Sequence, residues 1–303
     1  MTSLKEKVAI ILCVKDSKDF LIEQLDSIRI QEFVNCDIYV GNDGCSKETE
    51  RILTKHAKKI FTGPKDGFAK NFIYSLNNVP DNYDFYAFCD HDDVWMKSKL
   101  KHSIDCLRAF DKSEPNLYCG RTLLINETGN KIGFSPSFKK KPSFLNALVQ
   151  SIAGGNTMVF NKETKNLLSM VSLNKSIVSH DWLTYVLVSA VGGNIYYDNV
   201  PQIKYRIHKR NEIGSNKGLI AFYRRAKKVF NGSWESWISS NISQINEIVP
   251  QIRVDLSTFR KFIRMRNEKN IFKRIYLFLD LGIYRQTFIG NISLFLMIIL
   301  KKI

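Results

Sequence analysis

The chain has 303 residues, of which 44% are hydrophobic and 24% charged, and its formal net charge is +16. This length accommodates one large domain with an appendage, and the ordinary hydrophobic content excludes a disordered chain. Residues 204–303 hold 20 basic and 6 acidic residues, a net charge of +14 that leaves only +2 for residues 1–203. We therefore expect the C-terminal third to meet an acidic partner, which could be nucleic acid, an anionic lipid surface or a phosphorylated substrate.

The N-terminal half predicts alternating strands and helices. Residues 7–14 form an apolar run typical of a central strand, and apolar residues at helical spacing over 20–28 precede a second strand over 36–40. The same order continues through 43–60 and 67–76 to a strand that begins at Phe85. This order predicts an α/β fold with a doubly wound, mostly parallel, Rossmann-like sheet.

An acidic turn ends the strand that begins at Phe85. Asp90, Asp92 and Asp93 interrupt an apolar run that resumes at Val94. Open α/β sheets bind ligands at the carboxyl ends of their strands. Clustered carboxylates there suit Mg²⁺ or Mn²⁺, which complete their coordination with phosphate oxygens and water. The turn predicts a metal ion together with a nucleoside diphosphate, and a simple solvated turn is the alternative.

A second polar turn follows the strand over 36–40. Gly44 permits a tight turn, and Ser46 is placed to cap a helix that begins near Thr49. Asp43 could accept a hydrogen bond from the imide N–H of a pyrimidine base, or it could only tie down the turn. The sequence has no glycine-rich dinucleotide motif or P-loop, which disfavours dinucleotide redox enzymes and P-loop NTPases.

The C-terminal region changes to helices rich in Lys and Arg. We place a soft boundary near residue 217, with an α/β domain over 1–217 and a basic helical extension over 218–303. Phe259, Phe262 and Ile263 alternate with basic residues, as in an amphipathic helix at a lipid headgroup surface. Residues 288–300 are strongly apolar but shorter than the roughly 20 residues of a membrane-spanning helix. We expect the extension to lie on an anionic membrane surface; packing on the core or on a second subunit, as in a homodimer, is the alternative.

The order of these motifs resembles family 2 of the nucleotide-sugar glycosyltransferases, which have the GT-A fold. The resemblance covers roughly residues 7–215 and rests on the segments VAIILCVKD (8–16), GNDGCS (41–46), DGFAKNF (66–72), DHDDVW (90–95), AGGNTMVFN (153–161), SHDW (179–182) and YRIHKRNEIG (205–214). The last three segments look like the bacterial branch that includes many rhamnosyltransferases of surface-polysaccharide synthesis. Residues 13–16 and 211–213 depart from the usual family pattern.

The resemblance implies two groups of residues on the donor side. The nucleotide-binding group comprises Val14, Asp16, Asp43, Asn71, Asp90 and Arg206. The metal-binding group comprises Asp92 and His208, with Mg²⁺ or Mn²⁺ as the expected ion. Within the first group, Asp43 contacts the base, Asp90 contacts the ribose or the metal shell, and Arg206 is a counter-charge to phosphate because its planar fork matches two oxygens.

The resemblance also implies the residues on the acceptor side. Inverting transfer needs one carboxylate that removes the proton of the acceptor hydroxyl, while a metal stabilises the departing diphosphate. Asp181 is the candidate general base; the alternatives are that it caps a helix, or that His180, which titrates in a useful pH range, is the base. The acceptor wall is expected to contain Gly154, Gly155, Asn156 and Trp182. A sugar ring could stack on Trp182, although core packing is equally typical of such a residue.

Together these features predict an inverting, metal-dependent glycosyltransferase that adds a sugar to a lipid-linked or surface-polysaccharide glycan, such as an O-antigen or a capsule. The expected donor is dTDP-rhamnose, with a UDP-hexose such as UDP-galactose or UDP-glucose as the alternative. A non-catalytic nucleotide-sugar or glycan-binding protein is the alternative outside this class. A nucleic-acid partner is not expected, because the acidic turn would repel phosphates without a metal and no recognised binding motif is present. Six cysteines without paired spacing and no signal peptide predict a cytoplasmic protein, peripheral on the inner face of the cell membrane.

Overall fold

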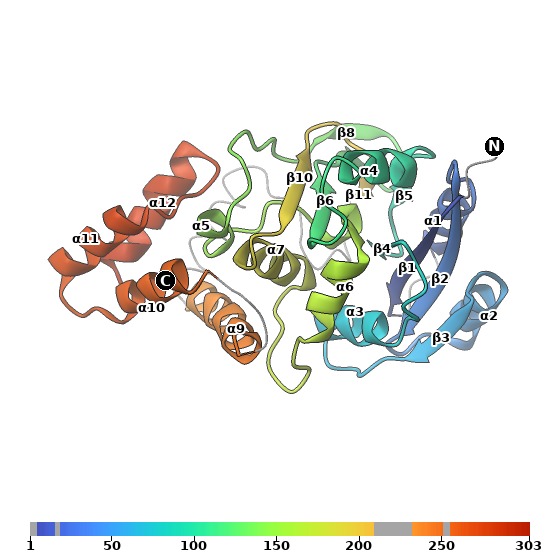
Figure 1. Cartoon of the computed structure of the whole chain (residues 1–303). Helices are drawn as coiled ribbons and strands as arrows, with labels where there is room; N and C mark the ends of the chain where they lie inside the picture. Colours follow the sequence, from blue (N-terminus) through green and yellow to red (C-terminus); the bar gives the residue numbers. More distant parts are fainter. Residues whose placement is uncertain (1–4, 16–18, 209–231, 251–254) are drawn as a thin grey trace.

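The computed structural model describes residues 5–15, 19–208, 232–250 and 255–303 (Figure 1). Its main sheet has seven strands in the order β10-β6-β9-β4-β1-β2-β3. Every neighbouring pair is parallel except the two pairs of β9, which runs antiparallel to β4 and β6. The strands are β1 (Glu6–Val14), β2 (Val34–Asn42), β3 (Lys59–Thr62), β4 (Phe85–Cys89), β6 (Asn116–Gly120), β9 (Val159–Asn161) and β10 (Asn194–Asp198). The predicted α/β class with a mostly parallel sheet is confirmed.

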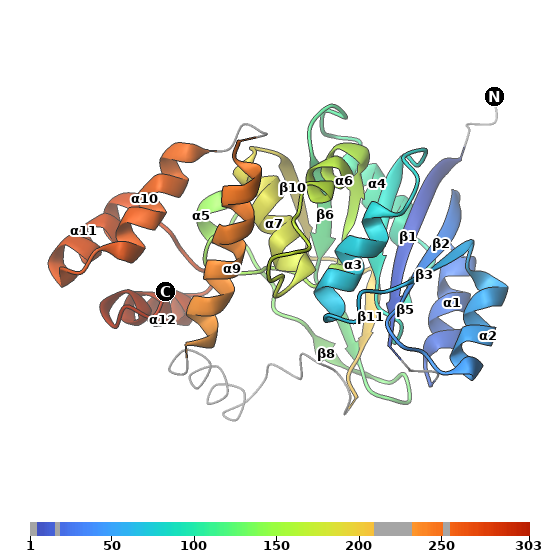
Figure 2. The ribbon, with the colours of Figure 1, turned by 90° about the horizontal axis from the view of Figure 1, so that it is seen from below.

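Helices cover both faces of this sheet because its central strands are apolar on both sides. Along β1, Ala9 and Ile11 belong to one apolar cluster, whereas Ile10 and Leu12 belong to the other, as the period of two of a strand requires. The first face carries α3 (Phe68–Asn77), α6 (Lys162–Ser169) and α7 (His180–Ala190), and the second carries α1 (Leu21–Arg29), α2 (Lys47–His56) and α4 (Lys99–Leu107) (Figure 2). The predicted cap of α2 is present, since the Thr49 N–H donates to Ser46 Oγ at 3.3 Å.

A second, four-stranded sheet in the order β5-β11-β7-β8 was not expected from the sequence. Its strands are β5 (Val94–Trp95), β7 (Leu123–Ile125), β8 (Lys131–Phe134) and β11 (Ile203–Arg206). β11 pairs antiparallel with β5, where Lys204 lies opposite Val94, and parallel with β7. This pairing brings the residues that follow β11 next to the acidic turn that precedes β5.

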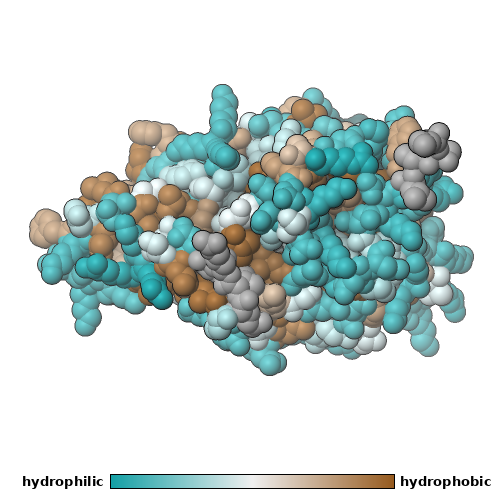
Figure 3. Space-filling model, in the orientation of Figure 1, coloured by the Kyte–Doolittle hydropathy of each residue, from teal (hydrophilic) through white to brown (hydrophobic). Residues whose placement is uncertain are grey.

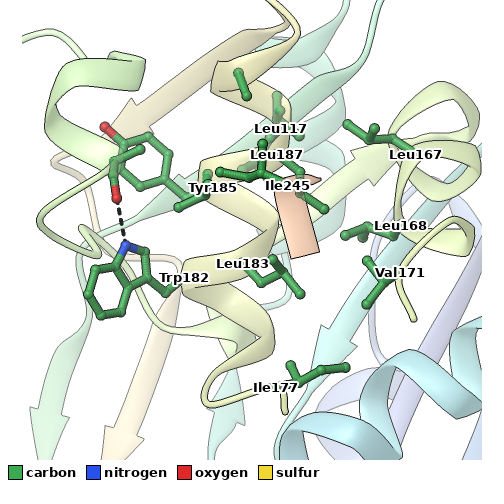
Figure 4. Packing of buried hydrophobic residues seen from close by; sticks show 14 of the residues in the cluster. Leu117, Leu167, Leu168, Val171, Ile177, Trp182, Leu183, Tyr185, Leu187 and Ile245 are labelled. Atoms are coloured by element: carbon green, nitrogen blue, oxygen red, sulfur yellow. Dashed lines mark hydrogen bonds between the residues drawn. The ribbon is translucent and has the colours of Figure 1, made fainter. Parts of the chain in front are cut away.

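The C-terminal helices complete the larger apolar cluster. Two short elements, α5 (Phe144–Ala147) and the 3₁₀ turn η1 (Gly155–Thr157), lie between elements of the α/β part. Four helices follow that part: α9 (Ser233–Ile248), α10 (Leu256–Asn267), α11 (Ile271–Leu281) and α12 (Phe288–Ile299). Ile245 of α9 packs with Leu183 and Leu187 of α7 and with Leu168 of α6 (Figure 4). The extension therefore shares a core with the α/β part, and the expected boundary near residue 217 lies outside the described residues.

The structure contradicts the expectation that the apolar residues of α10 face lipid. Phe259 is 4% exposed and Phe262 is fully buried, so both belong to the core and are turned away from solvent. Ile263 is partly buried against the same cluster. Across the part of the chain that the structure describes, no helix combines the length and the apolar character needed to cross a bilayer.

Candidate active site

The acidic turn after β4 meets the residues after β11, as the second sheet dictates. His208 Nε2 lies 2.8 Å from Asp92 Oδ2, and both side chains are almost buried, with 8% and 11% exposed. The ring of Phe20, just before α1, lies 5.3 Å from the imidazole of His208. The structure thus brings together the two side chains that were predicted to bind a metal, although 116 positions separate them in the sequence.

Asp93, next to Asp92 in the acidic turn, links this turn to two other segments through hydrogen bonds. Its side chain is fully buried, Oδ1 accepts a hydrogen bond from the Arg206 backbone N–H at 3.1 Å, and Oδ2 accepts one from Asn156 Nδ2. Burial and the neighbouring charge of Asp92 raise the pKa of Asp93, while Asn156 and Arg206 oppose the rise. One buried carboxylate therefore ties the acidic turn to β11 and to η1.

Arg206 differs from its expected placement beside a phosphate. The residue is 1% exposed, and its guanidinium donates to the backbone carbonyls of Asp92 at 3.2 Å and Glu127 at 2.9 Å and to the carboxylate of Glu23. The guanidinium also lies 4.4 Å from the centre of the Phe20 ring. These contacts occupy all three guanidinium nitrogens, so the fork holds the loops of the site together and does not point to a diphosphate.

The residues predicted on the nucleotide gather at the ends of β1 and β2. Asp43 Oδ1 accepts a hydrogen bond from the Lys65 N–H at 2.8 Å, and Asn71 Nδ2 donates to the Gly41 carbonyl at 2.9 Å. Burial raises the pKa of the Cys13 thiol, and the nearby charges of Asp90 and Asp43 raise it further, which places both carboxylates around the end of β1. Asp16 lies outside the described residues.

Two of the side chains predicted to contact the nucleotide are almost inaccessible to solvent. Val14 is 1% exposed and Asn71 is 1% exposed, so both side chains support the strand ends from within the core. Asp43 and Asp90 are only partly buried and remain the accessible carboxylates of this edge.

Asp181 lies in the first turn of α7, but it is not the N-cap residue. Ser179 is the N-cap, while Asp181 Oδ1 accepts a hydrogen bond from the Trp182 N–H at 2.6 Å. Burial raises the pKa of Asp181 to about 6, and the amides of Trp182 and Gly155 oppose this rise. A carboxylate with this pKa is ionised at neutral pH and can accept a proton.

His180 is enclosed by aromatic rings. Its imidazole stacks on Phe72 at 3.9 Å and meets Phe88 edge-on at 4.8 Å, and it is 3% exposed. Burial lowers the pKa of His180 to about 3, so the ring is neutral. This environment favours Asp181 over His180 as the base. A Cβ on Gly155 would lie 2.1 Å from His180 Nε2, which is why only glycine fits there.

The structure contradicts the prediction that a sugar ring stacks on Trp182, because the indole ring is buried in the core. It is 4% exposed, its Nε1 donates to the Ala147 carbonyl at 2.7 Å (Figure 4), and its ring lies 5.4 Å from that of Trp234. No face is left for a sugar. Asn156 is likewise buried and bonded to Asp93, Gly155 is buried, and Gly154 alone in the predicted acceptor wall is exposed.

The donor set around Asp92 fits a hard divalent cation in its chemistry. Among residues 5–15, 19–208, 232–250 and 255–303, no group of three or more His, Cys, Asp and Glu side chains converges as a metal site. The carboxylate of Asp92 is the kind of ligand that Mg²⁺ and Mn²⁺ take, usually one or two per ion with phosphate oxygens and water filling the shell, and the imidazole of His208 would add a nitrogen ligand.

Sequence reasoning missed several residues that shape the site. Glu23 and Phe20 hold Arg206 from α1 and the segment before it, and no motif marks either residue. Gly63, just after β3, allows close approach, since a Cβ there would lie 2.5 Å from Asp43 Oδ1. The position of Gly63 at the end of a strand was the one sequence feature that could have indicated its role.

Solved structures share this fold. The structure of residues 1–349 of TarS from S. aureus in complex with UDP aligns with a TM-score of 0.55 at 14% identity, covering 84% of this chain and 69% of that one. A mannosyltransferase of Pyrobaculum calidifontis in complex with GDP-Man and Mn²⁺ aligns with a TM-score of 0.50 at 11% identity, covering 97% and 88%. The fold is that of the GT-A glycosyltransferases.

Sequence comparison gives the family. The profile of Glycosyl transferase family 2 matches residues 9–168, and the chain belongs to this family. It is 28% identical over 237 residues to the dTDP-rhamnosyl transferase RfbG of Shigella flexneri, covering 74% of this chain and 79% of the relative. It is 22% identical to the putative teichuronic acid biosynthesis glycosyltransferase TuaG of Bacillus subtilis, covering 76% and 88%. The protein is thus a nucleotide-sugar glycosyltransferase.

Asp93→Asn tests the buried carboxylate. One oxygen is replaced by an amide that faces an N–H donor, and an unsatisfied buried donor costs about 1–3 kcal/mol. We expect urea unfolding to show a loss of stability of this order, with donor turnover reduced at least about tenfold. Asp105→Asn is the control, because this carboxylate is 40% exposed and exposed ion pairs contribute little. Equal effects of the two substitutions would contradict the role of Asp93.

Proposed function

We propose that the protein is an inverting, metal-dependent glycosyltransferase that transfers rhamnose from dTDP-rhamnose to a lipid-linked or surface-polysaccharide glycan at the inner face of the cell membrane. The observation that carries the proposal is the buried network around Asp93. Through Asn156 and Arg206 it connects the Asp92–His208 pair to the turn that contacts Asp181. The proposed donor side and acceptor side are thus linked by one set of buried hydrogen bonds.

On the donor side, Asp92 and His208 would hold Mg²⁺ or Mn²⁺. The bound cation would supply positive charge for the departing diphosphate. Asp43 and Asp90, at the ends of β2 and β4, would bind the base and the ribose. Arg206 acts as a positioning residue, since its contacts orient the backbone of the acidic turn and of β11.

On the acceptor side, Asp181 would take the proton of the attacking hydroxyl. Its raised pKa supports this role, because a base with a pKa near the working pH is both ionised and basic enough to accept a proton. The neutral, enclosed His180 supports the helix from behind, and Gly155 packs against it and presents its backbone amide to Asp181.

The choice of rhamnose rests on the similarity to RfbG of Shigella flexneri, and the choice of a cell-surface glycan rests on RfbG and on TuaG of Bacillus subtilis. The UDP in the complex of TarS makes a UDP-hexose the second candidate donor. The exposed apolar side chains of α11 and α12, together with the net positive charge of residues 256–303, support a location on an anionic membrane surface.

A panel of donors tests the substrate. We expect the full chain to hydrolyse dTDP-rhamnose in the presence of Mg²⁺ or Mn²⁺, and to hydrolyse UDP-glucose, UDP-galactose and UDP-N-acetylglucosamine at least about tenfold more slowly, since one pocket contact is worth on the order of 1–3 kcal/mol. Faster hydrolysis of a UDP-sugar would overturn the choice of donor and leave the class of reaction in place.

Asp181→Asn tests the base. The variant should bind the donor as the wild type does and lose transfer to acceptor by on the order of 10²- to 10⁴-fold, the usual contribution of a general base. In the wild type, protonation below a pKa of about 6 removes the base, so transfer should fall as pH decreases through 6. Glu163→Gln, which changes an acidic residue in the first turn of α6, is the control for effects on helix stability. Near wild-type turnover of Asp181→Asn would exclude the base role.

A further inference from the structure

Large hydrophobic side chains are concentrated on one exposed surface of the C-terminal helices. Among the described residues, sixteen large hydrophobic side chains are exposed, and ten of them lie between residues 271 and 300. We call the following eight the α11–α12 face: Phe272, Tyr276, Leu279, Phe288, Ile289, Ile292, Leu296 and Leu300. Figure 3 shows hydrophobic residues gathered at the end of the molecule that α10, α11 and α12 form.

The α11–α12 face is carried by two helices that contact each other. Phe272, Tyr276 and Leu279 have the spacing of one side of α11, while Leu277 and Leu281 on the other side are buried. The ring of Phe278 lies 5.9 Å from that of Phe295 on α12. This contact packs α11 against α12, so the exposed side chains of the face belong to two helices that touch each other.

The fold itself does not need this surface. The buried sides of both helices already pack in the larger apolar cluster through Leu277, Leu281, Leu294 and Ile298. Phe272 and Phe288 are each 80% exposed, an unusual state for phenylalanine in a chain that is alone in water. Clustered exposure of this kind marks a site that meets a membrane or another protein.

Charge selects between these occupants. Residues 256–303 contain ten Lys and Arg and two Asp and Glu, a net charge of +8. Lys269 and Lys273 are exposed at the start of α11, Lys301 is exposed after α12, and one of the two acids, Asp280, is paired with Lys261 at 3.0 Å. Two copies of this surface would bring like charges together, whereas anionic headgroups would complement them.

We propose that the α11–α12 face is a docking surface for an anionic lipid bilayer, with both helices lying in the plane of the interface. At 12 residues α12 is too short to span the hydrocarbon core. Apolar side chains on one side with a basic border are the pattern of helices that lie in the headgroup region. This inference deepens the proposed function, since it names the surface through which the enzyme meets a lipid-linked acceptor.

Contacts between the α11–α12 connection and the α5 region fix the position of the α11–α12 face relative to Asp181, the proposed general base. Asn146 Nδ2 of α5 donates to the Tyr284 carbonyl at 2.9 Å, and the Gln286 N–H donates to Gln150 Oε1 at 2.8 Å. The neighbouring Ala147 carbonyl accepts from Trp182 Nε1 at 2.7 Å, next to Asp181. Docking through this face would therefore hold the active site in one orientation to the bilayer.

The test uses the full chain with vesicles of phosphatidylcholine, with and without phosphatidylglycerol. The double variant Phe272→Gln, Phe288→Gln changes two exposed side chains, so folding should be retained, and circular dichroism checks this. We expect wild-type protein to co-sediment with the anionic vesicles and the double variant to bind at least about tenfold more weakly, because each buried Phe contributes about 1.5–3 kcal/mol. Phe33→Gln, at a phenylalanine that is 65% exposed on the α/β part, is the matched control and should bind as the wild type does.

A second variant tests the basic border. Lys269→Gln, Lys273→Gln and Lys301→Gln together should weaken binding to anionic vesicles and leave the weak binding to neutral vesicles unchanged. Donor hydrolysis should be unchanged in both surface variants, so failure of membrane binding and failure of the proposed reaction are separately visible. Unchanged vesicle binding by the double Phe variant would overturn the inference. So would light scattering that shows a wild-type dimer converted to a monomer by that variant while vesicle binding persists.

Discussion

Burial of one carboxylate organises this protein. Asp93 is removed from water and must find hydrogen-bond donors within the protein, since an unsatisfied buried polar group is costly. Its donors come from η1 and from the end of β11, segments far apart in the sequence. Satisfying Asp93 therefore forces Asp92, His208 and the turn beside Asp181 into one neighbourhood. The contacts of the active site are in this sense a consequence of closing the core around a polar group.

The sequence was sufficient for β1, β2 and β4 of the main sheet because local patterns determine these strands, whereas β6, β9 and β10 were not predicted. The apolar runs of β1 and β4, the cap at Ser46 and the helical spacing before residue 28 all depend on neighbours within one turn or one strand. The second sheet could not be predicted, because β5 is two residues long and pairs with β11 more than a hundred positions away. Such pairing leaves no local pattern in either segment.

The same division holds for the site. Motif order brought Asp92, His208 and Asp181 forward as candidates, and the structure makes Asp92 and His208 neighbours. Motifs could not tell which side chains face the ligand: Arg206 and Trp182 have the right chemistry, but both are held inside the protein. Orientation depends on partners such as Glu23 and Ala147, which carry no signature of their own. On α10 and α12 the apolar pattern was visible, yet only packing showed which side is covered.

The central claim is that Asp92 and His208 bind a nucleoside diphosphate through a shared divalent cation. Isothermal titration of the full chain with dTDP and with UDP, each with Mn²⁺ and with excess chelator, tests this claim most directly. The account predicts binding only with the cation, lost in His208→Ala and kept in His102→Ala, which changes a histidine paired with Asp198 elsewhere. Equal affinity for the diphosphate with and without the cation, or in His208→Ala, would contradict it.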